Sequence, residues 1–177
     1  MAIESIYWKE ELARIAASIS PVAKPKRWSE RLVCTTERDI MIACFIVRKL
    51  IELNKVSSRI SQMQMDVFST PVVKEVTKRN LVEISENYDW SAERSEKKPV
   101  MYICNQCIHS YLSFVDRGPD RNWSNILVVS DFDRRRVIWR IPVSTLTQLF
   151  LSASEDWPAS YSMVYDPRLG DYKVTTD

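Results

Sequence analysis

Apolar residues recur at helical spacing through most of the first half of the chain. In residues 5–19 they follow the three-to-four-residue period of an amphipathic helix. A second helix is predicted to begin at Ser29 or at Thr36, either of which can cap it, and to end near Asn54. Its segment 40–47 is apolar on all sides. Such a helix belongs in the middle of a bundle, so we predict that it is the central element of the fold.

The pattern becomes less regular between the second helix and residue 110. A third helix is predicted from about Ser57, closed by Pro71. Residues 87–98 are polar and charged, which predicts a mobile loop. A helix is expected over residues 99–109, because proline is tolerated in a first helical turn and the apolar rows resume.

Beyond residue 110 the apolar positions alternate or form short runs rich in Val, Ile and Trp, which is typical of strands. Strands are predicted at residues 111–115, 125–130 and 136–142, followed by a helix over 144–156 and a hairpin that pairs 161–165 with 172–176. This order predicts an α+β fold. An N-terminal helical bundle (about 1–110) precedes a small antiparallel sheet with one further helix (about 111–177), in a single domain covering 1–177.

Composition limits the class of protein. A chain of 177 residues with 45% apolar residues is expected to form one core, and 25 Lys and Arg against 23 Asp and Glu leave a net charge of +2. That balance excludes a nucleic-acid binder that relies on overall charge, so only local patches can serve this role. No segment reaches the ~20 apolar residues that span a bilayer, and residues 1–11 lack the core of a signal peptide. We therefore expect a cytoplasmic protein without a membrane partner. With two glycines, no glycine-rich nucleotide-binding loop can be written.

The candidate chemistry lies in the stretch from Cys104 to Tyr111, which holds the single histidine, His109. Histidine is the side chain best suited to acid–base catalysis near neutral pH. On the predicted helix, Asn105 and His109 are four residues apart and share one face. Cys104, Cys107 and His109 are possible zinc ligands, but a closed site needs four and no second pair is present. No metal or cofactor is therefore expected.

The segment from Asn105 to Tyr111 resembles the end of the motif of HEPN domains, Arg-Asn-x-x-x-His, followed in one branch by x-Tyr. These are helical proteins of prokaryotic defence and toxin-antitoxin systems. The resemblance covers Tyr102 to Phe114 and implies metal-independent RNA cleavage across a dimer interface. It assigns general acid–base catalysis to His109, its orientation to Asn105, and the motif tyrosine to Tyr111.

The motif arginine is replaced by Cys104. A thiol supplies neither the permanent charge nor the two-pronged hydrogen bonding with which a guanidinium holds a phosphate. Either Arg48 of the central helix substitutes for it, or the fold is kept for binding and the chemistry is lost. Arg48 could equally form an exposed ion pair with Glu52, one helical turn away.

A second candidate anion site is the turn that contains three consecutive arginines, Arg134, Arg135 and Arg136. The alternative is a charged turn that protects the sheet edges and favours solubility.

Two hypotheses therefore remain. The first is a HEPN-like module that binds or cleaves RNA and forms a dimer. The second is a non-catalytic interaction module, in which the helical bundle binds a partner protein and His109 stabilises the C-terminal end of a helix through the helix dipole.

Overall fold

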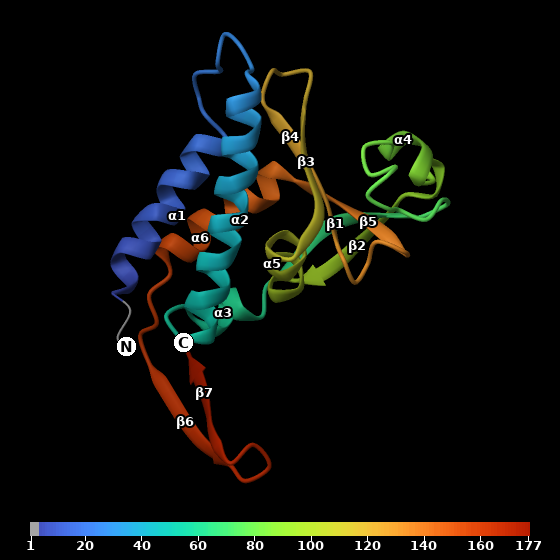
Figure 1. The fold of residues 1–177 in the computed structure, drawn as a ribbon. Helices are drawn as coiled ribbons and strands as arrows, with labels where there is room; N and C mark the ends of the chain where they lie inside the picture. Colours follow the sequence, from blue (N-terminus) through green and yellow to red (C-terminus); the bar gives the residue numbers. More distant parts are fainter. Residues whose placement is uncertain (1–3) are drawn as a thin grey trace.

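A computed structural model of the protein describes residues 4–177. Helices pack on one face of a five-stranded antiparallel sheet, a short irregular segment covers the other face, and a two-stranded hairpin projects from the body (Figure 1). The predicted α+β class is confirmed. None of the helices described in residues 4–177 combines the length and the apolar character that a bilayer crossing requires.

Four helices form the helical layer, and their ends agree closely with the periodicity of the sequence. They are α1 (Ser5–Ile19), α2 (Glu30–Glu52), α5 (Val100–Ile108) and α6 (Val143–Glu155); the short helices α3 (Ser58–Ser61) and α4 (Ile84–Asn87) and a 3-10 turn (Trp90–Ala92) lie in the connections. Ser29 is the cap of α2, since its hydroxyl oxygen accepts a hydrogen bond from the Leu32 amide at 3.2 Å. Thr36 lies inside the helix.

The sheet has the strand order β2-β1-β5-β4-β3, and every neighbouring pair is antiparallel. Its strands are β1 (Gln64–Pro71), β2 (Arg94–Pro99), β3 (Ser110–Arg117), β4 (Trp123–Ser130) and β5 (Val137–Pro142), and the separate hairpin consists of β6 (Tyr161–Asp166) and β7 (Asp171–Thr176). Strands β3, β4 and β5 form an antiparallel meander at the positions of the strands predicted over 111–115, 125–130 and 136–142.

Two predictions in the first half are wrong. The helix expected from Ser57 to Pro71 ends after one turn, and the chain continues as β1, in which Met65 and Val67 alternate with exposed Gln64 and Asp66. The loop expected over 87–98 contains β2, which pairs with β1 from Gln64↔Pro99 to Ser69↔Arg94. The charged residues of β2 suit an edge strand, because they discourage pairing with another chain. The helical part therefore does not extend unbroken to residue 110.

Helix α2 lies between α1 and α5, as expected of a central element (Figure 1). Its Ile40, Ala43, Cys44, Val47 and Leu50 are fully buried in the main core. The apolar pattern around residues 40–47 does not, however, lead to burial on all sides. Met41, Ile42 and Phe45 are 39–42% exposed, because neighbours pack against only part of the helix.

Candidate functional site

Helix α5 places Asn105 and His109 at the surface of the helical layer. Its inner face is buried by Ile103, Cys104 and Cys107, which pack in the main core against α2. His109 is the residue that ends α5, and its amide donates to the Asn105 carbonyl at 3.0 Å. The two side chains lie one turn apart, as the spacing predicts, and the His109 ring is exposed.

The third member of the group is Arg48 of α2. Its Nη1 donates to Asn105 Oδ1 at 3.0 Å and lies 3.4 Å from His109 Nε2. Because a guanidinium has only donors, this second contact is a hydrogen bond when Nε2 carries the lone pair. The packing of α2 against α5 thus places Arg48, the cation considered from the sequence, beside Asn105 and His109.

Glu52 orients the Arg48 guanidinium. Glu52 Oε1 accepts from Arg48 Nε at 2.7 Å, and Oε2 accepts from Lys49 Nζ at 2.6 Å. The hydrogen bonds from Lys49 and Arg48 lower the pKa of the Glu52 carboxyl. The expected pair of Arg48 and Glu52 is thus present, and it holds the arginine whose Nη1 contacts Asn105 and His109.

Cys104, at the position of the motif arginine, points into the core. The neighbouring Cys104 and Cys107 thiols, together with burial, raise the pKa of the Cys44 thiol of α2 well above its usual value. All three thiols are free and buried. A guanidinium at position 104 would lose its hydration in this environment. The small, buried thiol at position 104 therefore suits the core in which it lies.

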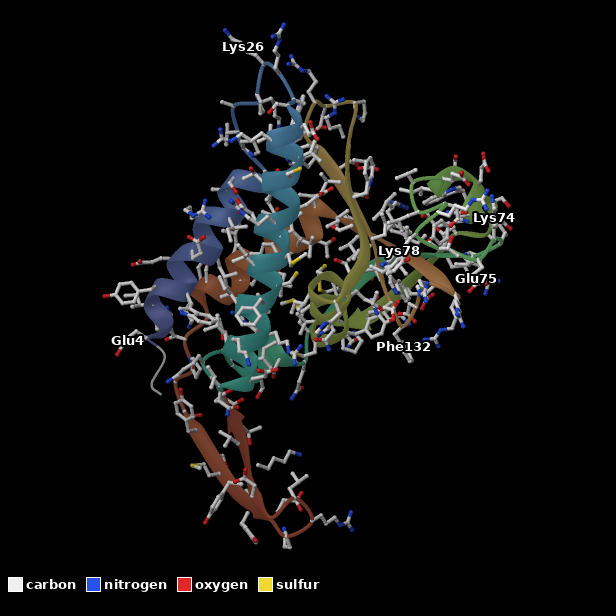
Figure 2. All side chains as sticks on the ribbon, viewed as in Figure 1. Glu4, Lys26, Lys74, Glu75, Lys78 and Phe132 are labelled. Carbon is white, nitrogen blue, oxygen red and sulfur yellow. The ribbon has the colours of Figure 1, made fainter. Side chains whose placement is uncertain are left out.

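A cleft of about 510 Å³ opens beside His109. Helix α5 forms one wall and the turn between β4 and β5 forms the other; the lining residues are Tyr102, Asn105, Gln106, His109, Ser130, Asp131 and Phe132. Phe132 is 79% exposed and projects from the turn (Figure 2). The cleft thus combines the histidine with polar amides and exposed aromatic surface.

The two walls are joined by a buried carboxylate that the sequence analysis missed. Asp133 Oδ2 accepts from Tyr102 Oη at 2.6 Å and from Gln106 Nε2 at 2.8 Å, while Oδ1 accepts from Arg136 Nη2 at 2.7 Å. Gln106 Oε1 in turn accepts from the Ser130 amide at 3.1 Å. Burial, followed by the bond to Asp133, raises the pKa of Tyr102, which stays a neutral donor. No spacing in the sequence pairs these residues, since Asp133 lies 27 positions after Gln106.

Tyr111 is not among the residues that line this cleft. It is half-buried near the start of β3 and packs against the smaller core on the other face of the sheet. Its ring centroid lies 4.9 Å from the Arg134 guanidinium carbon. Of the motif residues, Asn105 and His109 are brought together with Arg48, and Tyr111 is not.

The three consecutive arginines each have a carboxylate partner. Arg134 Nε lies 2.9 Å from Asp131, Arg135 Nε lies 3.1 Å from Glu75, and Arg136 Nη2 lies 2.7 Å from Asp133. Paired charges attract an added anion less than free ones do. Asp131 and Phe132 nevertheless bring this turn to the rim of the His109 cleft. An anion-binding role for the turn stays a prediction.

The rest of the surface offers less acid–base chemistry. A cleft of about 580 Å³ near the N-terminal end of α2 is lined by Trp28, Phe114 and Arg117 among others, and contains neither histidine nor cysteine. Within residues 4–177, no group of three or more His, Cys, Asp or Glu side chains is arranged to hold a metal ion.

Comparisons of the chain with protein-family models, with curated proteins and with solved structures gave no match.

Proposed function

We propose that this protein binds single-stranded RNA in the His109 cleft and cleaves it without a metal ion, as a HEPN-like module of a prokaryotic defence or toxin-antitoxin system. The observation that carries the proposal is the contact of Arg48 with both Asn105 and His109. It places a permanent cation beside the histidine, and these are the two groups that such a reaction requires.

The chemistry follows from the two side chains. When substrate binds, the Arg48 Nη1 donor turns from His109 Nε2 to a phosphoryl oxygen, and the freed lone pair of unprotonated Nε2 takes the proton of a ribose 2′-hydroxyl. The 2′-oxygen forms a bond to phosphorus, the bond from phosphorus to the 5′-oxygen breaks, and a proton from the medium ends on the departing oxygen. The products are a 2′,3′-cyclic phosphate and a 5′-hydroxyl. Arg48 stabilises the negative charge that gathers on the phosphoryl oxygens.

Asn105 serves as a positioning residue. Its side-chain oxygen holds the Arg48 guanidinium, and its carbonyl holds the backbone of His109. One residue therefore sets the separation between the base and the cation.

The cleft suits a nucleotide in size and in lining. Its volume of about 510 Å³ falls within the range of roughly 300–1,000 Å³ that is usual for small-molecule sites. Tyr102 and Phe132 offer aromatic faces for an unstacked base, and Asn105 carries a side-chain amide.

A non-catalytic interaction module is the second candidate. Two observations favour it: the exposed apolar residues Met41, Ile42 and Phe45 on α2, and a five-stranded sheet that an all-helical HEPN domain lacks. Under this alternative α2 binds a partner protein, and Arg48 and His109 are structural.

Cleavage of a fluorescent single-stranded RNA in the presence of EDTA tests the proposal. We expect wild-type protein to cleave it, and His109→Ala and Arg48→Ala to lose at least about 100-fold in rate. A 2′-deoxy substitution at the cleaved position should block the reaction, since it removes the nucleophile.

Arg14→Ala is the matched control. Like Arg48, Arg14 lies on a helix and forms an ion pair with a glutamate of the same helix, Glu11, but that helix is α1. The variant should leave cleavage unchanged. If the wild type shows no cleavage, the nuclease proposal fails. Fluorescence anisotropy with the same RNA would then show whether binding survives without chemistry.

A further inference from the structure

The C-terminal hairpin exposes many large apolar side chains for an element of only two strands. Within residues 4–177 its side-chain hydrogen bonds to the body lie at its base. Tyr161 Oη donates to the Asn54 carbonyl at 3.2 Å, Thr176 Oγ1 donates to the Val56 carbonyl at 2.8 Å, and Ser58 Oγ donates to the Thr176 carbonyl at 2.6 Å. Beyond this point β6 and β7 extend away from the body (Figure 1). Isolated two-stranded hairpins are marginally stable in water.

The strand register divides the hairpin into two unlike faces. Cross-strand partners share a face. One face carries Tyr161↔Thr176, Met163↔Val174 and Tyr165↔Tyr172, and the opposite face carries Ser162↔Thr175, Val164↔Lys173 and Asp166↔Asp171. The rings of Tyr165 and Tyr172 lie 5.4 Å apart, edge to face. The hairpin is therefore amphipathic. Strands with this pattern usually bury their apolar face against a second layer of the protein.

No layer within residues 4–177 covers this apolar face. Tyr161, Met163, Tyr165 and Tyr172 are 58%, 62%, 54% and 56% exposed. A fully exposed aromatic side chain presents roughly 150–250 Å², so each of the four leaves about 100 Å² accessible. Together with Val174 and the backbone, the face amounts to roughly 500 Å², near the upper limit of the largest apolar patch on an ordinary monomer.

We propose that this face is the dimerisation surface of the protein, and that it packs against the same face of a second copy about a two-fold axis. Two such faces bury about 1,000 Å², which reaches the lower limit of a specific interface. The product would be a small two-layer sandwich of four strands, in which the tyrosine-bearing faces are inside and the polar faces remain in water.

The charges on the hairpin agree with self-association. Asp166, Asp171, Arg168 and Lys173 balance one another at the tip and on the polar face. Two identical neutral arms do not repel, whereas a strongly charged arm would oppose pairing with its own copy. The apolar face itself carries no ionised side chain. Tyrosine and methionine, which form most of it, are enriched at protein interfaces.

Light scattering after size-exclusion chromatography of the full chain, at loading concentrations from about 2 to 200 µM, tests the proposal. We expect the measured mass to rise with concentration from 20.7 kDa toward twice that value. The double variant Met163→Ser with Tyr165→Ser should raise the dissociation constant at least about 100-fold, because it removes the centre of the interface.

Val164→Ser is the control, since Val164 is 63% exposed on the opposite face of the same strand. It should dimerise like the wild type. Should the double variant unfold the hairpin, single cysteines provide a second measurement. In a Cys34→Ser background, Met163→Cys should be joined to its copy by a short bifunctional maleimide, and Val164→Cys should not.

The proposal is overturned if the wild type remains a monomer up to about 200 µM, which would assign the face to a different protein. It is also overturned if Val164→Ser weakens the dimer as much as the double variant does, or if both cysteines react equally.

Discussion

Asp133→Asn is the substitution that most directly tests the structure of the cleft. The wild-type carboxylate is 3% exposed and accepts hydrogen bonds from Tyr102, Gln106 and Arg136. An asparagine keeps the shape of the side chain but loses its charge. One of the two acceptor oxygens becomes an NH₂ group, which cannot accept a hydrogen bond from the neighbouring donors.

The magnitude follows from the number of bonds. Hydrogen bonds to a charged group contribute about 1.5–3 kcal/mol each, and disrupting a buried charged network costs about 3–5 kcal/mol, because the remaining donors stay desolvated. We expect Asp133→Asn to lower the free energy of unfolding by about 3 kcal/mol. Tyr102→Phe, which removes a single donor, should lower it by about 1 kcal/mol.

Urea unfolding followed by tryptophan fluorescence measures both changes. Asp131→Asn provides the control, because Asp131 lies in the same turn with a side chain 76% exposed, and its loss should cost less than about 1 kcal/mol. If Asp133→Asn cost no more than this control, the carboxylate would not join the cleft walls. The cleft geometry would then rest on other contacts.

Three further predictions concern catalysis, pH and the core. Arg48→Lys should retain less than about a tenth of the wild-type cleavage rate in single-turnover assays, since an ammonium keeps the charge but cannot bond Asn105 and Glu52 with one planar group; full activity would refute the role of the guanidinium. Burial raises the pKa of Asp156, but the hydrogen bonds from the Ser57 amide and hydroxyl, together with Arg59, outweigh it and the net pKa is lowered. Ionised Asp156 therefore stabilises the fold above the unfolded pKa near 3.8, and this contribution is lost as pH falls through the lower folded pKa. In Asp156→Asn the free energy of unfolding in urea should fall less steeply between about pH 5 and pH 2 than in the wild type; an unchanged slope would contradict the lowered pKa of Asp156. Leu149→Ala, at a site 1% exposed, should cost about 2–5 kcal/mol in thermal unfolding, and Leu151→Ala, 40% exposed on the same helix, should cost less than about 1 kcal/mol; equal losses would mean that α6 is packed differently.

Helix ends and the meander could be predicted from the sequence, because their signals are local. The period of residues 5–19 matches α1 (Ser5–Ile19), and Ser29 caps α2 through a bond to an amide three residues away. Strand β1 was missed since Met63 and Val67, four residues apart, fit a helix equally well. One of its two partners, β2, lies about thirty residues downstream and is too polar for its sequence to predict a strand.

The same division holds for the candidate site. The pairing of Asn105 and His109 on one face follows from a four-residue spacing on a helix, and the sequence determined it by itself. Their contact with Arg48 spans 57 and 61 positions, and the bond that joins Gln106 to Asp133 spans 27. Only the packing of α2 against α5, and of α5 against β4, decided these contacts. Packing depends on many weak apolar contacts between residues far apart in the chain, so the spacing of residues within a short segment does not reveal it.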